Sequence, residues 1–369
     1  MNISTTKKEL QAAFSKLTKT AQVKSQNPLV NYTYISSGAH GVVLHSTDLE
    51  VGIKTQITAS VNTNGEGLFP TSEVNDIISV IDEGRVDIDI AGPHINIKSE
   101  KGISFDIPTV PFQEYPEMPE NKHEALFTIE TNKLKNIIGS LLYAINAEPT
   151  KPALNGAYFS FNEDRIDFVA TDGHRLVKIT RQNETNIQKG YIIPKKYLNI
   201  LNIFLEGQKE TSLIFSENYV FSNNGKDVFY SKIIDEKFPN YNAVIPEKNS
   251  KELVAQKTEM LNNIKAASIA TNKNTNQISL NFSEGKVYFK SVNQPESKTV
   301  YAPIKSAEYI GEEISIGFNA LYLKEAVAKY PSEEIFFTFK DSNSATLFLP
   351  KEKDQKTTIL LMPVRINEQ

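Results

Sequence analysis

The chain of 369 residues contains no cysteine. It therefore cannot form a disulfide framework, a thiolate zinc site or a cysteine nucleophile, and it fits a reducing compartment. No stretch approaches the roughly 20 apolar residues that a membrane-spanning helix needs. Residues 1–8 carry charges but are not followed by the apolar segment of a secretion signal. We expect a cytoplasmic protein.

The composition of the chain is typical of a folded globular protein. It has 40% hydrophobic and 23% charged residues, which excludes a disordered or fibrous chain. Its length exceeds what one hydrophobic core usually serves, so we expect two or three domains. The formal net charge is −4, which argues against wholesale coating of nucleic acid. Binding to nucleic acid would require basic residues gathered on one surface.

An internal repeat organises the sequence. Leu134 follows Leu10 by 124 residues, and the same spacing separates Pro70 from Pro194. This spacing is close to a third of the chain, so we predict three domains of one fold. Apolar residues at helical spacing recur in three segments: 6–22, 131–146 and 258–271. The predicted domains are 1–122, 123–246 and 247–369.

Runs of alternating polar and apolar residues, such as residues 85–90 and 278–282, lie between the predicted helices. This period is typical of half-buried antiparallel strands. The predicted class is α+β, in which two helices of each domain pack on an antiparallel sheet. Asp87 and Asp89 share one face of a predicted strand, but a solvated strand face explains them, and we predict no metal site.

Basic residues are concentrated on the first predicted helix of each repeat and on the segment that follows it. Eleven lysines stand there against three glutamates: Lys7, Lys8, Lys16, Lys19, Lys24, Lys133, Lys135, Lys151, Lys257, Lys265 and Lys273. Surface helices often carry lysine for solubility, but recurrence in three copies favours a shared function. Lysines without interleaved aromatic residues suit sequence-independent contact with phosphates. The second helix of the first repeat is an exception, with Glu73 and Asp76.

The turn at residues 170–176 has two interpretations. Asp172 and His174 could be a catalytic pair in a hydrolase, or the turn could be a rigid strand corner. The first repeat has Thr47 and Asp48 at the equivalent place, and such side chains bond nearby backbone amides, which favours the corner. An enzyme would also need a nucleophile, metal or cofactor site, and the sequence shows no motif for one. The hydrolase remains the disfavoured alternative.

Four motifs in order carry a family resemblance. They are residues 154–156 (Leu-Asn-Gly), 171–176 (Thr-Asp-Gly-His-Arg-Leu), 238–241 (Phe-Pro-Asn-Tyr) and 361–366 (Leu-Met-Pro-Val-Arg-Ile). Together with the repeat, they resemble the bacterial DNA sliding clamp, the beta subunit of DNA polymerase III. The resemblance covers essentially the whole chain.

The resemblance implies a processivity factor without catalytic activity or cofactor. Two chains would join head to tail, and their six domains would form a ring that encircles duplex DNA, with the helices lining the hole. Its implied partners are the catalytic subunit of DNA polymerase III, the clamp loader and other proteins with clamp-binding motifs, and no membrane. A clamp-like paralogue with a specialised or regulatory role is the alternative.

The resemblance also assigns residues by position. The implied DNA-facing residues are Lys24, Glu148, Lys151, Lys196 and Asn319. The implied pocket for partner peptides is formed by Leu154, Thr171, Gly173, His174, Arg175, Leu176, Pro239, Val244, Leu360, Met362, Pro363, Val364 and Arg365. In this pocket we expect apolar walls, and we expect His174 or Arg175 to orient polar groups. The implied dimer interface contains Phe105, Ile107, Ala267, Ile269 and Ala270. Ala243 and Ala345 depart from the family pattern, which predicts a different motif preference.

Overall fold

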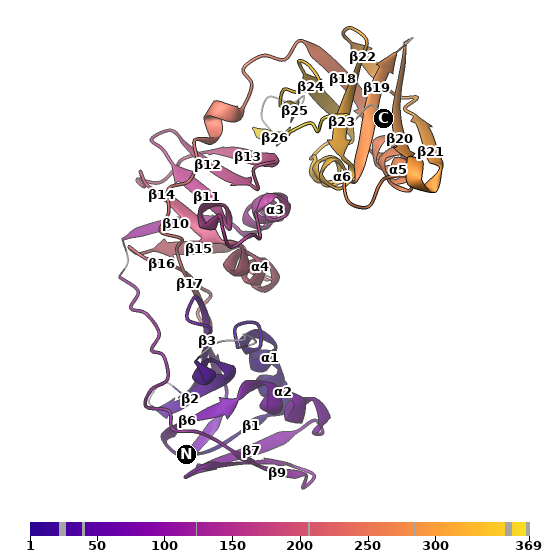
Figure 1. The fold of residues 1–369 in the computed structure, drawn as a ribbon. Coiled ribbons are helices and arrows are strands. Elements are labelled where there is room, and N and C mark those ends of the chain that lie inside the picture. The colour runs from indigo at the N-terminus through magenta and orange to yellow at the C-terminus, as the bar shows by residue number, and fades with distance from the viewer. Residues whose placement is uncertain are drawn as a thin grey trace. The chain divides into compact units, whose positions relative to one another are not determined.

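The computed structural model describes residues 1–21, 27–38, 41–122, 124–205, 207–283, 285–350 and 356–366. Each third of the chain contributes two α-helices and a set of antiparallel strands (Figure 1). The α+β class and the three similar domains are therefore confirmed. Within these residues the α-helices are α1 (Lys7–Leu17), α2 (Thr71–Val80), α3 (Thr131–Leu141), α4 (Lys195–Phe204), α5 (Lys257–Ser268) and α6 (Ala320–Lys329). In the part of the chain that is described, no helix is long and apolar enough to cross a membrane.

The first helix shows how the sequence specifies these elements. The side chain of Thr6 accepts a hydrogen bond from the backbone N–H of Glu9 at 3.2 Å, which caps the helix N-terminus. Leu10, Phe14 and Leu17 recur at spacings of four and three residues and are buried along one face. The helix ends at Leu17, several residues before the end of the predicted segment.

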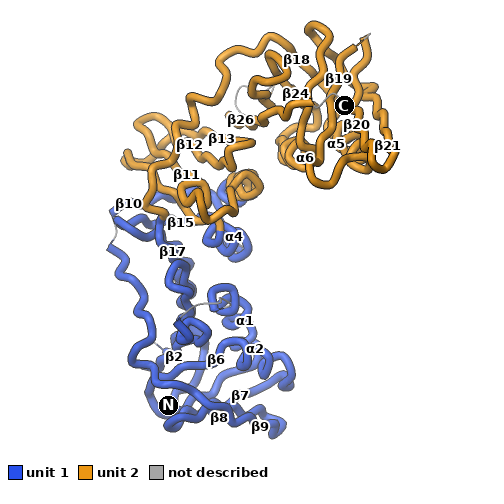
Figure 2. The backbone as a smooth tube through the Cα atoms, in the orientation of Figure 1, with its two compact units in different colours: residues 1–135, 196–233 blue, residues 136–195, 234–369 orange. Residues whose placement is uncertain are grey.

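The chain divides into two compact units, which are coloured separately in Figure 2. Unit 1 comprises residues 1–135 and 196–233 and contains a five-stranded and an eight-stranded sheet. In the order of hydrogen-bonded neighbours, the five-stranded sheet contains β5 (Ser60–Thr63), β1 (Asn2–Thr6), β7 (Arg85–Ala91), β8 (His94–Ser99) and β9 (Ser104–Pro108). The eight-stranded sheet contains β10 (Ala125–Glu130), β15 (Glu210–Phe215), β16 (Tyr219–Asn223), β17 (Asp227–Lys232), β4 (Val51–Ile57), β3 (Gly41–Thr47), β2 (Tyr32–Gly38) and β6 (Gly65–Pro70).

Unit 2 comprises residues 136–195 and 234–369 and contains a nine-stranded and a four-stranded sheet. The nine-stranded sheet contains β14 (Gly190–Pro194), β11 (Gly156–Phe161), β12 (Arg165–Thr171), β13 (Arg175–Gln182), β26 (Thr357–Leu361), β25 (Thr346–Phe348), β24 (Glu334–Phe339), β18 (Lys251–Gln256) and β22 (Glu308–Ile310). The four-stranded sheet contains β21 (Lys298–Pro303), β20 (Lys286–Asn293), β19 (Gln277–Ser283) and β23 (Ile314–Asn319).

Two strand pairs join consecutive thirds of the chain within these sheets. In unit 1, β4 pairs with β17, which belongs to the middle third. In unit 2, β13 of the middle third pairs with β26 of the last third. Both pairs are antiparallel, so ladder hydrogen bonds continue a sheet from one repeat into the next. The two units therefore differ from the three repeats because the strands of the middle repeat are shared between them.

Candidate functional site

The turn after β12 is a hydrogen-bonded corner. The carboxylate Oδ1 of Asp172 accepts the backbone N–H groups of His174 at 2.9 Å and Arg175 at 3.0 Å. The hydroxyl of Thr171 donates to the carbonyl of Arg175 at 2.6 Å and accepts the N–H of Gly173 at 3.1 Å. Gly173 has φ +90°, a conformation that glycine adopts without steric cost. Asp172 is thus engaged in shaping the turn.

The first repeat builds the same corner 124 residues earlier. Thr47 bonds the carbonyl of Val51 and the N–H of Leu49, and Asp48 accepts the N–H groups of Glu50 and Val51. Leu49 takes the place of Gly173 with φ +79°, although a leucine side chain disfavours that conformation. The prediction that the Thr-Asp pair is structural is confirmed by these equivalent bonds.

Arg175 is buried and bonded within unit 2. Its side chain is 8% exposed, and its Nε lies 3.0 Å from Oδ2 of Asp172. The guanidinium group lies over the rings of Tyr143 and Tyr322, at 4.9 and 4.4 Å from their centroids, and it also pairs with Glu325. These contacts occupy the group that we expected to orient polar groups of a ligand. Arg175 instead ties the corner to α6.

A cavity of about 380 Å³ opens beside this corner in unit 2. Ten of the thirteen predicted pocket residues line it, together with two that the prediction missed, Asn240 and Tyr241. The lining residues are Leu154, Thr171, Gly173, His174, Arg175, Leu176, Pro239, Asn240, Tyr241, Val244, Leu360 and Met362. Pro363, Val364 and Arg365 do not line it. Val364 is held elsewhere, because its N–H donates to the carbonyl of Gly317 at 2.9 Å.

The walls of the cavity are apolar and backed by a sheet. Leu176 and Leu360 lie opposite each other where β13 pairs with β26. The N–H of Met362 donates to the carbonyl of His174 at 2.9 Å, which fixes the chain after β26. Val244 and Met362 remain 53% and 37% exposed, so apolar surface is available to a ligand. A pocket of this kind suits apolar side chains of an inserted peptide.

The imidazole of His174 stacks on the ring of Tyr322 in α6, with ring centroids 5.9 Å apart. Its backbone carbonyl accepts the hydrogen bond from Met362, and its backbone N–H donates to Asp172. The acidic group of the suspected catalytic pair therefore contacts the backbone of His174 and the guanidinium of Arg175. These contacts give the turn a structural role.

Tyr241 reaches the cavity from the 3-10 helix η4 (Tyr241–Val244), which belongs to the segment leading into the third domain. Its hydroxyl donates to Oδ2 of Asp167 at 3.0 Å. Asp167 is fully buried and also accepts a hydrogen bond from Thr180 at 2.6 Å and lies 3.3 Å from Nζ of Lys178. Tyr241 could have been predicted, because it ends the Phe-Pro-Asn-Tyr motif that carried the resemblance.

The carboxylate of Asp167 stays ionised inside the protein. Burial opposes this by raising the pKa of Asp167, but the bond from Thr180 and the charge of Lys178 outweigh burial and hold the pKa below its ordinary value. Burial and the neighbouring Asp167 charge raise the pKa of Tyr241 to about 12. The tyrosine therefore remains a hydrogen-bond donor at neutral pH.

The predicted DNA-facing residues are divided between the two units, with Lys196 in unit 1 and Glu148, Lys151 and Asn319 in unit 2. Lys196 of α4 pairs with Asp48, whose side chain is 4% exposed. Lys151 and Glu148 are exposed and 3.7 Å apart at their charged atoms. Asn319 caps α6 by accepting the backbone N–H of Leu321 at 3.0 Å. Lys24 lies outside the described residues.

The predicted interface residues divide into buried and accessible ones. Ala267 and Ala270 are buried in the core of the third domain, at 0% and 1% exposure, whereas Ile269 between them is 75% exposed. On β9, Phe105 is half-buried and Ile107 is 6% exposed. Only part of the predicted set is therefore available on the surface of one chain.

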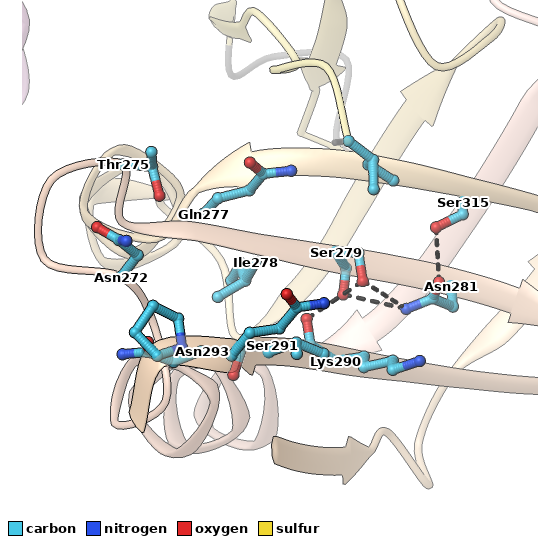
Figure 3. A pocket seen from close by; sticks show the side chains of 14 residues that line it. Asn272, Thr275, Gln277, Ile278, Ser279, Asn281, Lys290, Ser291, Asn293 and Ser315 are labelled. Atoms are coloured by element: carbon cyan, nitrogen blue, oxygen red, sulfur yellow. Dashed lines mark hydrogen bonds between the residues drawn. The ribbon is translucent and has the colours of Figure 1, made fainter. Parts of the chain in front are cut away.

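A second hollow of about 520 Å³ lies in the third domain, and nine of its fourteen lining residues carry amide or hydroxyl side chains (Figure 3). Asn281 donates to the hydroxyl of Ser279 at 3.0 Å and accepts the hydroxyl of Ser315 at 2.6 Å. These groups bond one another, in contrast to the apolar walls of the first cavity. Among the described residues, no group of three histidine or acidic side chains could hold a metal ion.

The repeated domains, their shared sheets and the apolar cavity define a three-domain protein of the clamp fold. Family models described as the N-terminal, central and C-terminal domains of the DNA polymerase III beta subunit match residues 1–119, 128–240 and 242–365. The chain therefore belongs to the family of DNA polymerase III beta subunits.

Similar proteins extend over nearly the whole chain. The beta sliding clamp of Rickettsia felis is 27% identical over 360 residues, covering 93% of this chain and 94% of that protein. The beta sliding clamp of Pseudomonas aeruginosa is 26% identical over 328 residues, covering 88% of each. The crystal structure of the sliding clamp from Bartonella birtlesii bound to griselimycin superposes with a TM-score of 0.93 at 25% identity, covering 99% of this chain and 100% of that one.

Proposed function

We propose that the chain is a processivity factor. Two copies would form a head-to-tail ring that encircles duplex DNA, slides along it and tethers a DNA polymerase. The observation that carries the proposal is the repeated sheet junction. β4 pairs with β17 and β13 pairs with β26, so the same kind of junction joins domain one to two and domain two to three. We propose the domain bounds that the repeat predicts, 1–122, 123–246 and 247–369.

Closure of the ring requires one more junction of this kind in each subunit. β9 and β21 are edge strands of their sheets among the described residues. Unpaired sheet edges attract a further strand. Pairing of β9 with β21 of a second copy is a head-to-tail contact, which closes into a ring when the rotation permits. Phe105, Ile107 and Ile269 would contribute to this interface.

Contact with DNA would be weak and independent of sequence. Lysines of α1, α3 and α5 supply positive charge in a chain of net charge −4. Lys16 and Lys196 pair with Asp227 and Asp48, and these carboxylates partly neutralise the positive charge that the lysines could offer to phosphates. An encircling ring does not need strong phosphate contacts, because its topology retains the DNA. Lys24, Lys151 and Asn319 remain candidate contacts, and Glu148 would partly neutralise Lys151.

The apolar cavity beside His174 would receive short segments of partner proteins. Leu154, Leu176, Leu360 and Met362 offer walls for leucine or phenylalanine side chains of such a segment. The partners proposed are the catalytic subunit of DNA polymerase III, the clamp loader and other proteins with clamp-binding motifs. The protein itself would have neither catalytic activity nor a cofactor, and it would act in the cytoplasm, where the bacterial chromosome is replicated.

Retention on DNA tests the encircling ring. The protein is loaded by its clamp loader onto nicked circular DNA and then passed through a sizing column in moderate salt, before and after the DNA is linearised. We expect retention on circular DNA and loss from linear ends. Equal, steeply salt-dependent loss from both forms contradicts encirclement.

Stimulation of the cognate polymerase distinguishes a replicative clamp from a specialised paralogue of the same family. A replicative clamp lengthens the products made in one binding event, in the presence of the loader. A specialised paralogue would encircle DNA without this stimulation.

A further inference from the structure

The two junctions within the chain share one register. A corner of four residues precedes each junction strand, and the first residue that pairs across the corner is Gly52 in β4 and Leu176 in β13. Across the junction, Gly52 lies opposite Tyr230, and Leu176 lies opposite Leu360. The repeat therefore conserves the position of each junction strand relative to its corner.

The third domain has a corner of the same length, formed by a 3-10 turn in place of the Thr-Asp bonds, and it is followed by a strand with a free edge among the described residues. Residues 294–297 join β20 to β21, and Lys298 is the first residue of β21 to pair across the corner, opposite Asn293. Lys298 is thus equivalent to Gly52 and Leu176. Among the described strands, β21 is bonded to β20 alone, so one edge of it has no strand partner.

The strand equivalent to β17 and β26 in the first domain is β9. Each domain has a row of paired residues that starts at its first strand and crosses the sheet. The rows are Ile3–Ile88–Ile97–Phe105, Phe127–Leu213–Ser222–Phe229 and Leu253–Phe337–Phe348–Ile359. Phe105 is therefore equivalent to Phe229 and Ile359. The next residue, Asp106, is equivalent to Tyr230 and Leu360.

We infer that β9 pairs with β21 of a second copy in this register, so that Asp106 lies opposite Lys298 of the partner subunit. The inference rests on the proposed dimer and adds its register and a charge pair that aligns it. Residues directly opposite in an antiparallel pair point to the same face and interact most strongly. A two-fold symmetric dimer contains this pair twice.

The charges of both residues are accessible within one chain. Asp106 is 64% exposed and lies 3.4 Å from Nδ1 of His94, and Lys298 is 54% exposed and lies 2.6 Å from Glu296. Each residue can therefore meet an opposite charge without first losing a buried partner. A register shifted by two residues keeps the same faces but places Ser104 or Pro108 opposite Lys298 of the partner subunit. Such a shift forfeits the charge pair.

Thiol cross-linking tests the register, because the wild-type chain has no cysteine to interfere. The variant Asp106→Cys/Lys298→Cys is compared with Ser104→Cys/Lys298→Cys after treatment with a short thiol cross-linker. We expect covalent dimers mainly from the first variant. Stronger cross-linking of the second variant overturns the register while leaving the dimer intact. A monomeric mass of the wild-type chain at all concentrations overturns the proposed dimer instead.

Charge exchange tests the pair itself. We expect Lys298→Glu to weaken dimerisation about fivefold or more, since it places two like charges opposite each other twice. The double variant Asp106→Lys/Lys298→Glu should recover most of the affinity. Lys286→Glu makes the same charge change on an exposed position of β20 and should have little effect. A double variant as weak as Lys298→Glu alone contradicts the inference.

Discussion

Lys16 of α1 and Asp227 of β17 form an ion pair with Nζ 2.5 Å from Oδ2, although 211 positions separate them in the sequence. The carboxylate is 5% exposed and also accepts the hydroxyl of Thr55 at 2.6 Å. The pair therefore fastens the first helix to a strand of the middle domain beside the β4–β17 junction. It also occupies a lysine on a helix proposed to face DNA.

We predict that Asp227→Asn destabilises the protein by about 2 to 4 kcal/mol at pH 7, because it leaves Lys16 without its buried partner. The measurement is the free energy of unfolding in urea. Burial raises the pKa of Asp227, but the bonds from Lys16 and Thr55 outweigh burial and hold that pKa below its ordinary value. The stabilisation is thus present above the unfolded-state pKa and is lost as the pH falls through the folded-state pKa. The difference between wild type and variant should shrink in that acidic window.

A second pH dependence should come from His45. This side chain is 5% exposed, its Nε2 lies 2.8 Å from the hydroxyl of Tyr230, and burial followed by the charge of Lys54 lowers the pKa of His45 to about 4. The unfolded state binds a proton near pH 6.5 and the folded state does not, so stability should fall by at most about 3 kcal/mol as the pH drops from 6.5 to 4. Urea unfolding of wild type and His45→Gln at both pH values checks this. An equal slope in the variant would exclude His45 as the cause.

Tyr241→Phe should weaken binding of a partner peptide about three- to tenfold, because it removes the bond that holds η4 against buried Asp167. Fluorescence titration with a labelled clamp-binding peptide measures the affinity. Tyr115→Phe is the matched control. Its hydroxyl is also buried and donates to the carbonyls of Tyr32 and His45, but it does not line the cavity. Equal loss of affinity in both variants would indicate a general effect of stability.

Met362→Ala and His174→Ala should each weaken binding of the same peptide and have little effect on dimerisation. Met362 exposes apolar surface in the cavity. His174 also lines the cavity, and its ring is held by stacking on Tyr322. We expect a loss of about tenfold for Met362→Ala, in line with the removal of a half-buried apolar side chain. Val80→Ala changes an exposed residue of α2 and serves as the control. Unchanged affinity in both pocket variants would refute the pocket assignment.

Periodicity and the internal repeat were sufficient to predict the class of fold and the three domains. The amphipathic positions Leu10, Phe14 and Leu17 are buried as expected, and the Thr-Asp corner was recognisable because it occurs twice. What periodicity does not convey is which strand extends which sheet. The pairing of β4 with β17 joins residues far apart in sequence, and local patterns contain no information about it.

Long-range partners also account for contacts of the predicted site residues that the sequence did not reveal. Arg175 looked available to a ligand because its partner Glu325 lies 150 positions away, in another domain. Lys196 was assigned to DNA contact by its position in the family resemblance, and its pairing with Asp48, 148 positions away, was not predicted. In both cases a charged side chain that was assigned to a ligand forms an ion pair within the chain.

The repeated junction also separates two kinds of equilibrium. The β4–β17 and β13–β26 ladders join segments of one polypeptide, so their formation is unimolecular and dilution leaves it unchanged. The proposed β9–β21 ladder joins two molecules, and mass action governs it. At low protein concentration the same chain would keep its internal sheets intact while the ring comes apart at that third contact. The abundance of the protein would then set how many closed rings are available to load.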